Sequence, residues 1–359
     1  MILLFIGCGE DGVTVAQNGD LRLPAGFSIE EYAAAPNARS MVLGDEGTLF
    51  VGTRSDGRVF ALTDDDGDGF HDTRHTIASG LNMPNGVAFK DGALYVAEVS
   101  RVMRYSDIEA NLDNVPEPEV IRDDFPTDQS HGWKYIAFGP DGKLYVPVGA
   151  PCNICDPDDA IYATITRMDA DGSNREIVAH GIRNTVGFDW HPDTGELWFT
   201  DNGRDWLGDD LPPDELNRVE VVGQHFGYPY VHGDGIEDPE FHELMPDTVE
   251  WTAPERELGP HVAALGVDFY EGAMFPREYR NQLFVAEHGS WNRSEKIGYR
   301  VMLVRLEDNH AVSYEPFVTG WLDSDGSVSG RPVDLIELPD GSLLVSDDAA
   351  GRIYRITYE

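Results

Sequence analysis

Arginine, histidine and asparagine residues recur at matching places along this chain, just before or just after short apolar runs. Those that precede a run are Arg39, Asn85, His131, Arg183, Asn184, His261 and Arg331. Those that follow a run are Arg54, Glu98, Asn202, Gly203, His288 and Asp347. Any one of them could be an ordinary polar turn residue, but their recurrence favours a shared site. Because most of their charge is positive in an acidic chain, they predict a pocket for a small anionic ligand or cofactor.

A second candidate for chemistry is the acidic segment 64–72, which reads Asp-Asp-Asp-Gly-Asp-Gly-Phe-His-Asp. Asp64, Asp66, Asp68 and Asp72 stand at positions one, three, five and nine of a calcium-binding loop, in which carboxylate oxygens surround the ion. The acid that closes such a loop at position twelve is replaced by His75. The segment is therefore either a calcium loop or a solvated acidic hairpin.

Cys152 and Cys155 form a CxxC pair in the segment Pro-Cys-Asn-Ile-Cys-Asp. Such a pair can be half of a zinc site, a redox pair or a local disulfide. Structural zinc is disfavoured, because the chain has no second CxxC and no histidine pair at ligand spacing. The thioredoxin-like alternative needs a βαβ context that the sequence does not show. We therefore expect a disulfide that pins a loop outside the cytoplasm.

An internal repeat indicates which elements must position these residues. A Gly or Asn, one further residue and a short apolar-aromatic run recur six times, at 47–53, 92–98, 142–149, 195–202, 281–289 and 341–348. Ahead of each copy lies another apolar run that ends in a turn, and a third run follows most copies. Asp-Gly and Pro-Asp at the turns are typical of hairpins, since Gly and Asp tolerate positive φ.

Six units of three or four antiparallel strands predict an all-β fold, a six-bladed β-propeller. The last run, 351–358, and an early one, 27–33, could pair within one blade and close the ring. We expect one domain over residues 21–359. The long gaps at 203–280 and 290–340 should hold large loops, which in compact domains are usually functional.

The composition excludes several classes of function. With 26 Lys+Arg against 65 Asp+Glu, the formal charge is −39, which repels phosphate backbones and argues against nucleic-acid binding. The hydrophobic fraction of 41% is enough for a sizeable core and excludes disorder throughout. Lysine occurs only at 90, 134, 143 and 296. This acid excess with few lysines indicates either adaptation to high salt (a halophilic surface) or simply an acidic secreted protein.

Residues 1–8 form an apolar run that is too short to span a bilayer. The Gly7-Cys8 end resembles a bacterial lipoprotein signal, in which Cys8 would carry lipid; the alternative is an ordinary ragged N-terminus. Residues 9–20 are polar and are interpreted as a tether, so that 1–20 form a lipoprotein-like leader. We therefore expect a periplasmic or extracellular protein with at most a lipid anchor to the membrane.

Several longer motifs resemble one family. Residues 131–146 (HGWKYIAFGPDGKLYV), 181–185 (GIRNT), 214–217 (DELN), 226–229 (FGYP) and 330–334 (GRPVD) are similar to the soluble quinoprotein sugar dehydrogenases, over about residues 21–359. The Cys-Asn-Ile-Cys segment and residues 288–293 (HGSWNR) resemble the L-sorbosone dehydrogenase branch more than the glucose dehydrogenase branch.

The resemblance implies a six-bladed propeller that holds pyrroloquinoline quinone (PQQ) and Ca²⁺. Such an enzyme oxidises an aldose or a sugar aldehyde to a lactone or acid and passes electrons to an external acceptor of cytochrome or quinone type. His131 would be the general base, and Arg183 would stabilise charge on the quinone oxygen. The cofactor-binding positions would be Arg183, Asn184, Asn202, Asp214, His261, Arg331 and Lys296, with Arg293 as the alternative to Lys296.

For calcium, the resemblance implies that the backbone carbonyls of Gly203 and Arg204 hold the ion against the quinone. A second, structural calcium would use Glu215 and the Phe226 carbonyl. The glucose dehydrogenase branch has Gly-Pro where this chain has Gly203-Arg204, followed here by a longer insert, 205–213.

Two further positions differ from the glucose dehydrogenase branch. That branch has an Asp where Ala150 stands, so a carboxylate that orients His131 must come from elsewhere or be missing. It also has an Arg where Val333 stands.

Two other functions remain open at this point. A calcium-dependent lactonase is also built on six blades and would need a cage of carboxylate and Asn ligands, for which Glu98, Asn184 and Asp347 are the candidates. A non-enzymatic propeller could bind a partner on its face. The number of arginines favours the dehydrogenase, because a bare calcium cage should be acidic.

Overall fold

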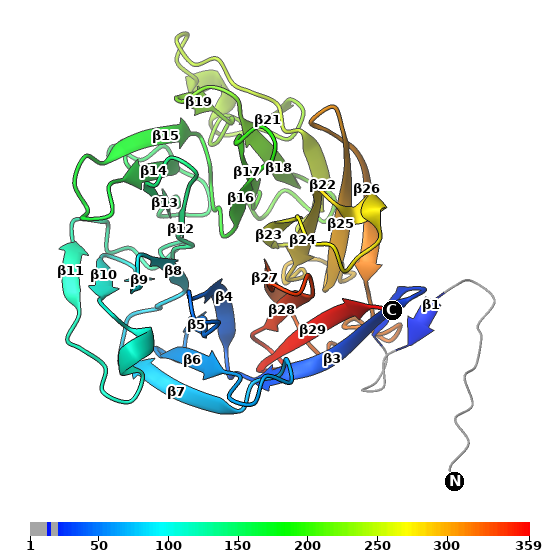
Figure 1. Cartoon of the computed structure of the whole chain (residues 1–359). Helices are drawn as coiled ribbons and strands as arrows, with labels where there is room; N and C mark the ends of the chain where they lie inside the picture. The colour runs from blue at the N-terminus through cyan, green and yellow to red at the C-terminus, as the bar shows by residue number, and fades with distance from the viewer. Residues whose placement is uncertain (1–12, 16–20) are drawn as a thin grey trace.

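The computed structural model describes residues 13–15 and 21–359, and it arranges six antiparallel sheets in a closed ring (Figure 1). The chain is thus a six-bladed β-propeller, as the repeat predicts. The first strands of the six blades contact one another around the centre. They are β4 (Ala38–Leu43), β8 (Gly86–Lys90), β12 (Ala137–Phe138), β16 (Phe188–Trp190), β23 (Ala264–Tyr270) and β27 (Pro332–Glu337).

The second strands coincide with the six repeat copies. They are β5 (Leu49–Thr53), β9 (Ala93–Ala97), β13 (Leu144–Val148), β17 (Leu197–Asp201), β24 (Gln282–Glu287) and β28 (Leu343–Asp347). Almost every residue in them is buried. Each blade packs both of its faces against a neighbour, so these strands are apolar on both sides and the sequence shows continuous runs instead of an alternation.

Two outer strands complete each blade. The third strands are β6 (Val59–Thr63), β10 (Val102–Tyr105), β14 (Thr164–Met168), β18 (Pro213–Val219), β25 (Arg300–Glu307) and β29 (Arg352–Tyr358). The outermost strands are β7 (Thr73–Ala78), β11 (Glu119–Arg122), β15 (Glu176–His180), β22 (Arg256–Pro260), β26 (His310–Val318) and β3 (Phe27–Ala34). Blades 1 to 6 are numbered here from the sheet that contains β4 to the sheet that contains β27.

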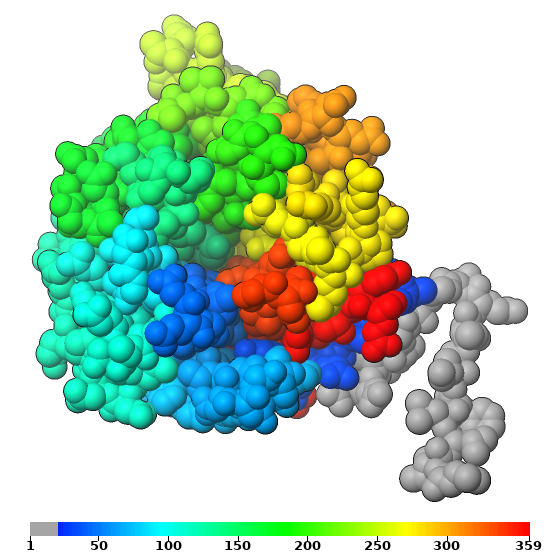
Figure 2. Space-filling view, viewed as in Figure 1, coloured from blue at the N-terminus to red at the C-terminus, as the bar shows by residue number. Residues whose placement is uncertain are grey.

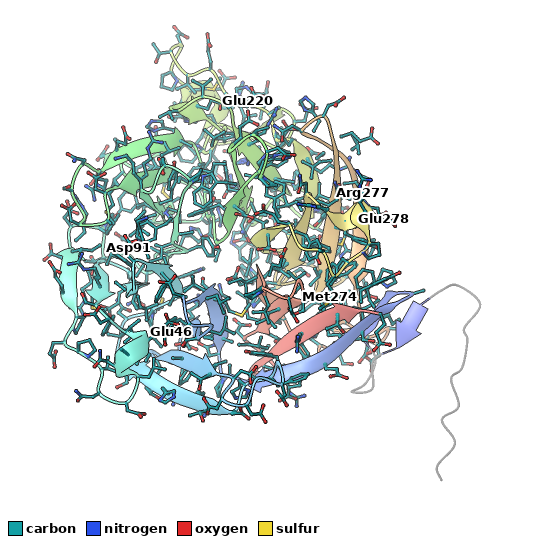
Figure 3. The ribbon with its side chains drawn as sticks, viewed as in Figure 1. Glu46, Asp91, Glu220, Met274, Arg277 and Glu278 are labelled. Atoms are coloured by element: carbon teal, nitrogen blue, oxygen red, sulfur yellow. A yellow bond between two sulfur atoms is a disulfide. The ribbon has the colours of Figure 1, made fainter. Side chains whose placement is uncertain are left out.

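Blade 6 is built from both ends of the described chain, which closes the ring. β29 pairs antiparallel with β3, from Arg352 opposite Ala34 to Tyr358 opposite Phe27, and the two strands run side by side in Figure 1. The expected pairing of 351–358 with 27–33 is confirmed. The space-filling view shows the resulting closed outline with a recess near its middle (Figure 2). Glu46, Asp91 and Met274, which Figure 3 labels, mark turns between first and second strands and are spread around the ring.

The long gaps in the repeat contain short strands and a helical turn as well as loops. In the gap after β17, the segment between β18 and β22 carries the single-turn helix η2 (His242–Leu244), the hairpin of β20 (Val231–His232) and β21 (Ile236–Glu237), and β19 (Gln224–His225), which joins β15 in parallel. In the gap at 290–340, β25 and β26 lie between two loops, residues 288–299 and 319–331.

The remaining elements of the described chain are short. Two further single-turn 3-10 helices are η1 (Glu109–Asn111) and η3 (Arg277–Tyr279), and β1 (Val13–Val15) pairs with β2 (Arg22–Pro24). Three residues of the expected tether therefore lie in a strand. Cys8 and the rest of the expected leader lie outside the described residues. Within the described ranges, no helix has the length and apolar character that crossing a bilayer requires.

The seam between blades 5 and 6 is held by an aromatic cluster around Phe27. The Phe27 ring makes edge contacts with Phe275, Tyr279, Phe317 and Tyr358, at centroid distances of 4.9–5.1 Å. Phe27 is 1% exposed. β3 thus contributes a central side chain to the core between blades 5 and 6.

Phe27→Ala is expected to lower the free energy of unfolding by about 3–5 kcal/mol, because it leaves a cavity among four aromatic rings. Urea unfolding followed by circular dichroism measures this loss. Val312→Ala, on the half-exposed side of β26, is the matched control and should change stability by less than about 0.5 kcal/mol. Equal stability of Phe27→Ala and the wild type would contradict this role of the seam.

Candidate active site

One cavity of about 310 Å³ opens at the end of the ring where first strands begin and second strands end. Of the residues expected to bind cofactor or act in catalysis, His131, Arg183, Asn184, Asn202, Gly203, Asp214, His261 and Arg331 line it together. The other lining residues are Arg39, Arg54, Trp133, Asp205, Ala263, Leu265, His288, Trp291 and Asn292. We call this cavity the funnel; blades 1, 3, 4, 5 and 6 contribute to it.

Lys296 does not line the funnel. Its Nζ donates a hydrogen bond to the carbonyl of Gly326 on the exposed side of the loop, at 2.8 Å. Arg293, the alternative to it, donates to the carbonyl of Asp209. These two cations therefore lie at the rim of the funnel, outside its lining.

The lactonase cage does not form among the described residues. Glu98 accepts a hydrogen bond from the Asn82 amide and pairs with Arg101. Asp347 accepts hydrogen bonds from the backbone amides of Arg331 and Ala350. Neither carboxylate lines the funnel.

Three arginines come close together at the blade 6 to blade 1 side of the funnel. The guanidinium of Arg54 lies 3.7 Å from the centre of the Trp133 ring. Burial and the positive charge of Arg39, with a smaller contribution from Arg331, lower the pKa of Arg54 to about 10. Within the described chain the Arg54 side chain makes no hydrogen bond, so its donors are available to a ligand. A carboxylate placed there would relieve the repulsion.

Arg39 and Arg331 are held by fixed partners. Arg39 pairs with Asp348 at 3.0 Å and donates through Nε to the Asn85 side chain at 2.8 Å. The Nε of Arg331 donates to the carbonyl of His288 at 2.9 Å. His288 also pairs through Nε2 with Asp348, at 2.8 Å, and burial lowers the pKa of His288 to about 4. Asn85, expected in the funnel, does not line it, but its side chain accepts a hydrogen bond from Arg39, which does.

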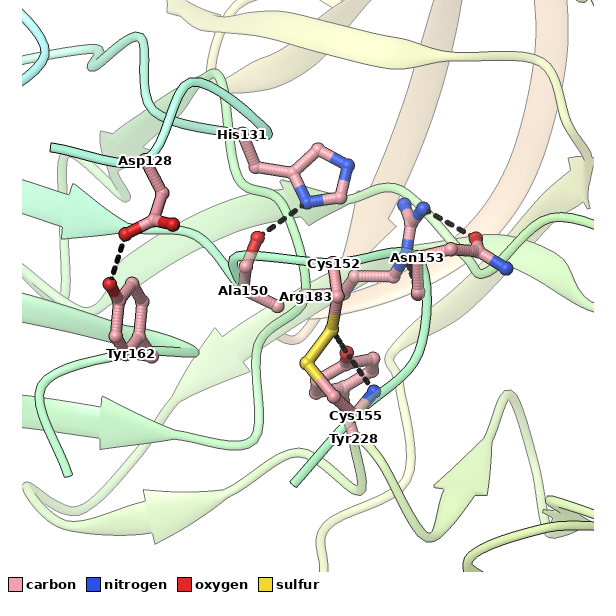
Figure 4. The surroundings of a disulfide bond; sticks show 9 residues. All are labelled: Asp128, His131, Ala150, Cys152, Asn153, Cys155, Tyr162, Arg183 and Tyr228. Atoms are coloured by element: carbon pink, nitrogen blue, oxygen red, sulfur yellow. Dashed lines mark hydrogen bonds between the residues drawn. A yellow bond between two sulfur atoms is a disulfide. The ribbon is translucent and has the colours of Figure 1, made fainter. Parts of the chain in front are cut away.

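His131 presents a neutral ring to the funnel. Its Nδ1 lies 2.9 Å from the carbonyl of Ala150 (Figure 4), and since that carbonyl can only accept, Nδ1 carries the hydrogen and Nε2 the lone pair. Burial, and next the charge of Arg183, lower the pKa of His131 to about 3. The backbone carbonyl of Ala150 therefore orients the ring, at the position where the glucose dehydrogenase branch has an Asp side chain.

The approach of His131 to its neighbouring strand is very close. Its backbone has φ of 49°, which is uncommon outside glycine. A β-carbon at Gly149 would lie 2.6 Å from the β-carbon of His131. The position after β13 must therefore be glycine for the histidine to sit at the funnel wall.

The CxxC segment forms a disulfide, Cys152–Cys155, and the expected pairing is confirmed (Figure 4). Asn153, which follows the first cysteine, holds the catalytic candidate Arg183. The Nε of Arg183 donates to the Asn153 carbonyl at 2.8 Å, and Nη2 donates to the Asn153 side-chain oxygen at 2.9 Å. Sequence reasoning assigned the motif by its sulfurs and missed Asn153, although the residue lies inside it.

The loop after β17 is fixed by the buried side chain of Asp214 and the half-buried side chain of Asn202. Asp214 accepts the amide of Gly203 at 2.9 Å, and burial raises the pKa of this carboxyl to about 7. The Asn202 side chain donates to the carbonyls of Asn184 and Ala264, at 3.1 and 2.8 Å. Among the described residues no hydrogen bond ends on the Gly203 carbonyl. Such an oxygen beside the funnel suits a hard cation.

A second, very small cavity lies behind this loop and is lined by Gly203, Asp201, Glu215 and Phe226, among others. Burial and the charge of Glu215 raise the pKa of Asp201, and burial raises the pKa of Glu215 to about 7. Two buried carboxyl groups with raised pKa values are a donor set that a divalent cation would stabilise.

Arg204 lines neither cavity. It pairs with Asp238 at 2.7 Å and Glu240 at 2.8 Å, so only its backbone can serve a cation near the funnel. As at Gly203, no hydrogen bond within the described chain ends on the Arg204 carbonyl.

The expected calcium loop lies on the β6–β7 turn, outside the funnel. Oxygens of Asp64, Asp66 and Asp72 come within 4.8 Å of one another. They accept backbone amides of the turn: Asp64 accepts Gly67 and Gly69, and Asp72 accepts Asp65. Asp68 accepts the amide of Phe70. Calcium binding here stays a prediction.

Comparison with known proteins gives a family and a fold. A family model described as "Domain of unknown function (DUF7133)" matches residues 16–349. An uncharacterized protein of Borreliella burgdorferi is 35% identical over 353 residues, covering 94% of this chain and 91% of that protein. A pyrroloquinoline quinone-dependent pyranose dehydrogenase of Coprinopsis cinerea is 32% identical over 122 residues, which cover 29% of this chain and only 16% of that protein.

Solved structures share the propeller. The holo pyranose dehydrogenase PQQ domain of Coprinopsis cinerea matches with a TM-score of 0.78 at 18% identity, covering 96% of this chain and 100% of that one. A calcium structure of a Trichoderma reesei family AA12 enzyme gives 0.78 at 20% identity, with 98% and 100% covered. The PQQ-bound aldose sugar dehydrogenase of Streptomyces coelicolor gives 0.66 at 18% identity, with 94% and 100% covered. At these identities the likeness shows the six-bladed fold.

His131 is expected to stay neutral, with hydrogen on Nδ1, from about pH 8 down to about pH 4, as read from imidazole ¹⁵N shifts assigned with His131→Gln. Its folded pKa lies below the unfolded value of about 6.5, so the unfolded chain takes up the proton first as pH falls. Protonation of this histidine in the unfolded chain therefore costs the protein no stability above about pH 6.5, and it lowers the free energy of unfolding progressively as the pH falls from there toward about pH 3. Protonation with a midpoint near pH 6.5 would contradict the burial of this ring.

Proposed function

This chain belongs to the family described as "Domain of unknown function (DUF7133)", and from its site we propose that it is a quinoprotein sugar dehydrogenase. It oxidises the anomeric hydroxyl of an aldose, or the hydrate of a sorbosone-like sugar aldehyde, to a lactone or acid. Pyrroloquinoline quinone takes up the two electrons, and an external cytochrome or quinone acceptor removes them. The observation that carries the proposal is the neutral His131 ring beside four arginines in one funnel.

The funnel fits the cofactor by charge. Pyrroloquinoline quinone is a planar tricarboxylate, and a guanidinium fork matches a carboxylate with two parallel hydrogen bonds. Arg54 has its donors free in the described chain and a pKa lowered by burial and by its like-charged neighbours, as expected of a cation that awaits an anion. Arg331 and Arg183 would add contacts from blades 6 and 4. The names of the structural neighbours support the same cofactor.

Calcium would be held by backbone oxygens of Gly203 and Arg204, and a second ion by Glu215 and the Phe226 carbonyl next to Asp201. These are hard oxygen donors, which calcium prefers. When both groups are bound, they supply an electrophilic quinone carbonyl, polarised by the cation, that can accept a hydride from the sugar carbon.

His131 takes the proton of the sugar hydroxyl on Nε2, while the Ala150 carbonyl holds Nδ1–H and so fixes the ring orientation. The charge of Arg183 helps to keep the pKa of His131 low. An anionic ligand beside Arg183 would offset that charge and raise the pKa toward the working range. A bound anion would thus make His131 a stronger base by offsetting the Arg183 charge, which lowers the pKa less than burial does.

A location outside the cytoplasm, periplasmic or extracellular, remains part of the proposal. The Cys152–Cys155 disulfide supports it, because disulfides persist in oxidising compartments. The formal charge of −39 agrees with a surface suited to high salt. Lipid attachment at Cys8 rests on the sequence alone.

Reconstitution of the apoprotein with pyrroloquinoline quinone and Ca²⁺ should give dye reduction with members of a panel of aldoses and sugar aldehydes. His131→Ala should bind the quinone as tightly as the wild type in an absorbance titration, yet lose at least about a hundredfold in turnover. His310→Ala, at a surface histidine of β26, is the matched control and should keep full activity. Absence of any spectral change and of turnover with every substrate would refute the proposed function.

Arg54→Gln should weaken quinone binding by roughly ten- to a hundredfold, the cost of one charge-assisted contact of about 1.5–3 kcal/mol. The melting temperature of the apoprotein should change little, because the substitution loses the contact of the guanidinium with the Trp133 ring but also removes repulsion from Arg39, and it breaks no hydrogen bond of the described chain. Arg352→Gln, at a half-exposed arginine of β29 that pairs with Glu31, is the control. Unchanged affinity in Arg54→Gln would show that the cofactor does not use this part of the funnel.

A further inference from the structure

Two tryptophans stand exposed at the mouth of the funnel. Trp206, in the loop after β17, is 67% exposed, and Trp291, in the loop after β24, is 65% exposed. Their rings contact each other, with centroids 5.5 Å apart and planes at 88°. Trp291 also lines the funnel. We call this pair the tryptophan corner.

The loops that carry the corner are fixed to each other near its base. The Asn292 side chain donates to Asp205 at 2.6 Å, and the Ser294 amide donates to Asp209 at 3.1 Å. From below, the Nε2 of His261 lies 3.0 Å from the Gly208 carbonyl. The exposure of the two rings is therefore a property of anchored loops.

Folding does not account for this arrangement. Trp206 has φ of 72°, a backbone conformation that costs energy for a bulky residue. An indole is also the side chain that gains most from being covered, since it buries about 150–250 Å². The other large apolar side chains left exposed in the described chain are Val and Leu residues, such as Leu244. Two exposed indoles that touch each other beside a cavity indicate a surface that a ligand covers.

We propose that Trp206 and Trp291 form a stacking subsite for an uncharged sugar ring, so that the substrate is a saccharide of two or more rings whose end ring reaches His131. The inference rests on the proposed function, because it assigns the far part of that enzyme's substrate. The apolar C–H face of a pyranose packs on an indole. A corner of two perpendicular rings offers such a non-planar ligand a face and an edge.

The charges around the corner select an uncharged ligand. The Trp206 loop carries Asp205, Asp209 and Asp210, and the Trp291 loop carries Glu295. Two cations face them at the rim, Lys296 and Arg293, which pairs with Asp210 at 3.4 Å. Carboxylates are thus in excess, which disfavours an anion at the rim. Deeper in the funnel, Arg54 and Arg183 repel a cation. A neutral saccharide lies across both regions at no electrostatic cost and leaves the arginines to the cofactor.

The test is saccharide binding to the apoprotein, measured by calorimetry with methyl glucoside, cellotetraose, maltotetraose and xylotetraose. The wild type should bind at least one tetrasaccharide more tightly than the monosaccharide. Trp206→Ala and Trp291→Ala should each weaken tetrasaccharide binding about tenfold, as expected for loss of one stacking contact, and leave monosaccharide binding unchanged. Trp206→Phe should retain most of the affinity, and Leu244→Ala, at an exposed leucine of the blade 4 insertion, should retain all of it.

Because this measurement needs no quinone, its result is separate from the proposed function. Tetrasaccharide binding that depends on both tryptophans, in a protein that cannot be reconstituted, would leave the subsite standing and refute the dehydrogenase. No preference for any tetrasaccharide, or unchanged affinity in both alanine variants, would overturn the subsite. A loss confined to electron transfer to the dye in the reconstituted variants would assign the corner to the acceptor, and it would also overturn the proposal.

Discussion

The repulsion among arginines gathered at one end of a narrow ring is the constraint on which the site depends. Each guanidinium is offset differently: Arg39 by Asp348, Arg331 by the carbonyls of His288 and Gly289, and Arg54 by the face of Trp133. Carbonyls are available there because strands end at the funnel and leave backbone groups unpaired. The propeller thus concentrates positive charge inside a strongly negative protein, a charge that an anionic ligand would balance.

His131 is coupled to this charge. Its pKa is held low by burial and by Arg183, and Arg183 is in turn held by Asn153 and the carbonyl of Asn202. A group that binds near Arg183 would therefore change the proton affinity of His131 without touching it. Ligand binding at Arg183 and the proton affinity of His131 are linked through one side chain, and the disulfide loop sets where that side chain lies.

The sequence predicts most of the fold because hairpin repeats are local: each run pairs with the next, and the turn residues mark where. It also predicts which positions meet at the funnel, since equivalent strand ends converge in a ring. Contacts made by backbone atoms or between distant loops leave no such pattern. The Ala150 carbonyl that orients His131 has no signature in residue type, and neither the contact of Trp206 with Trp291 nor the parallel addition of β19 follows from periodicity.

The closing strand has a consequence for biosynthesis. β3 spans Phe27–Ala34 and its partner β29 spans Arg352–Tyr358, so blade 6 cannot form until more than 300 residues beyond β3 have been made. Arg331 precedes the first strand of that blade, and Arg39 lies in the first strand of the next one around the ring. The funnel is therefore among the last features to assemble. A nascent chain that does not yet include β29 has no complete blade 6, and the funnel lacks one of its walls until that strand is made.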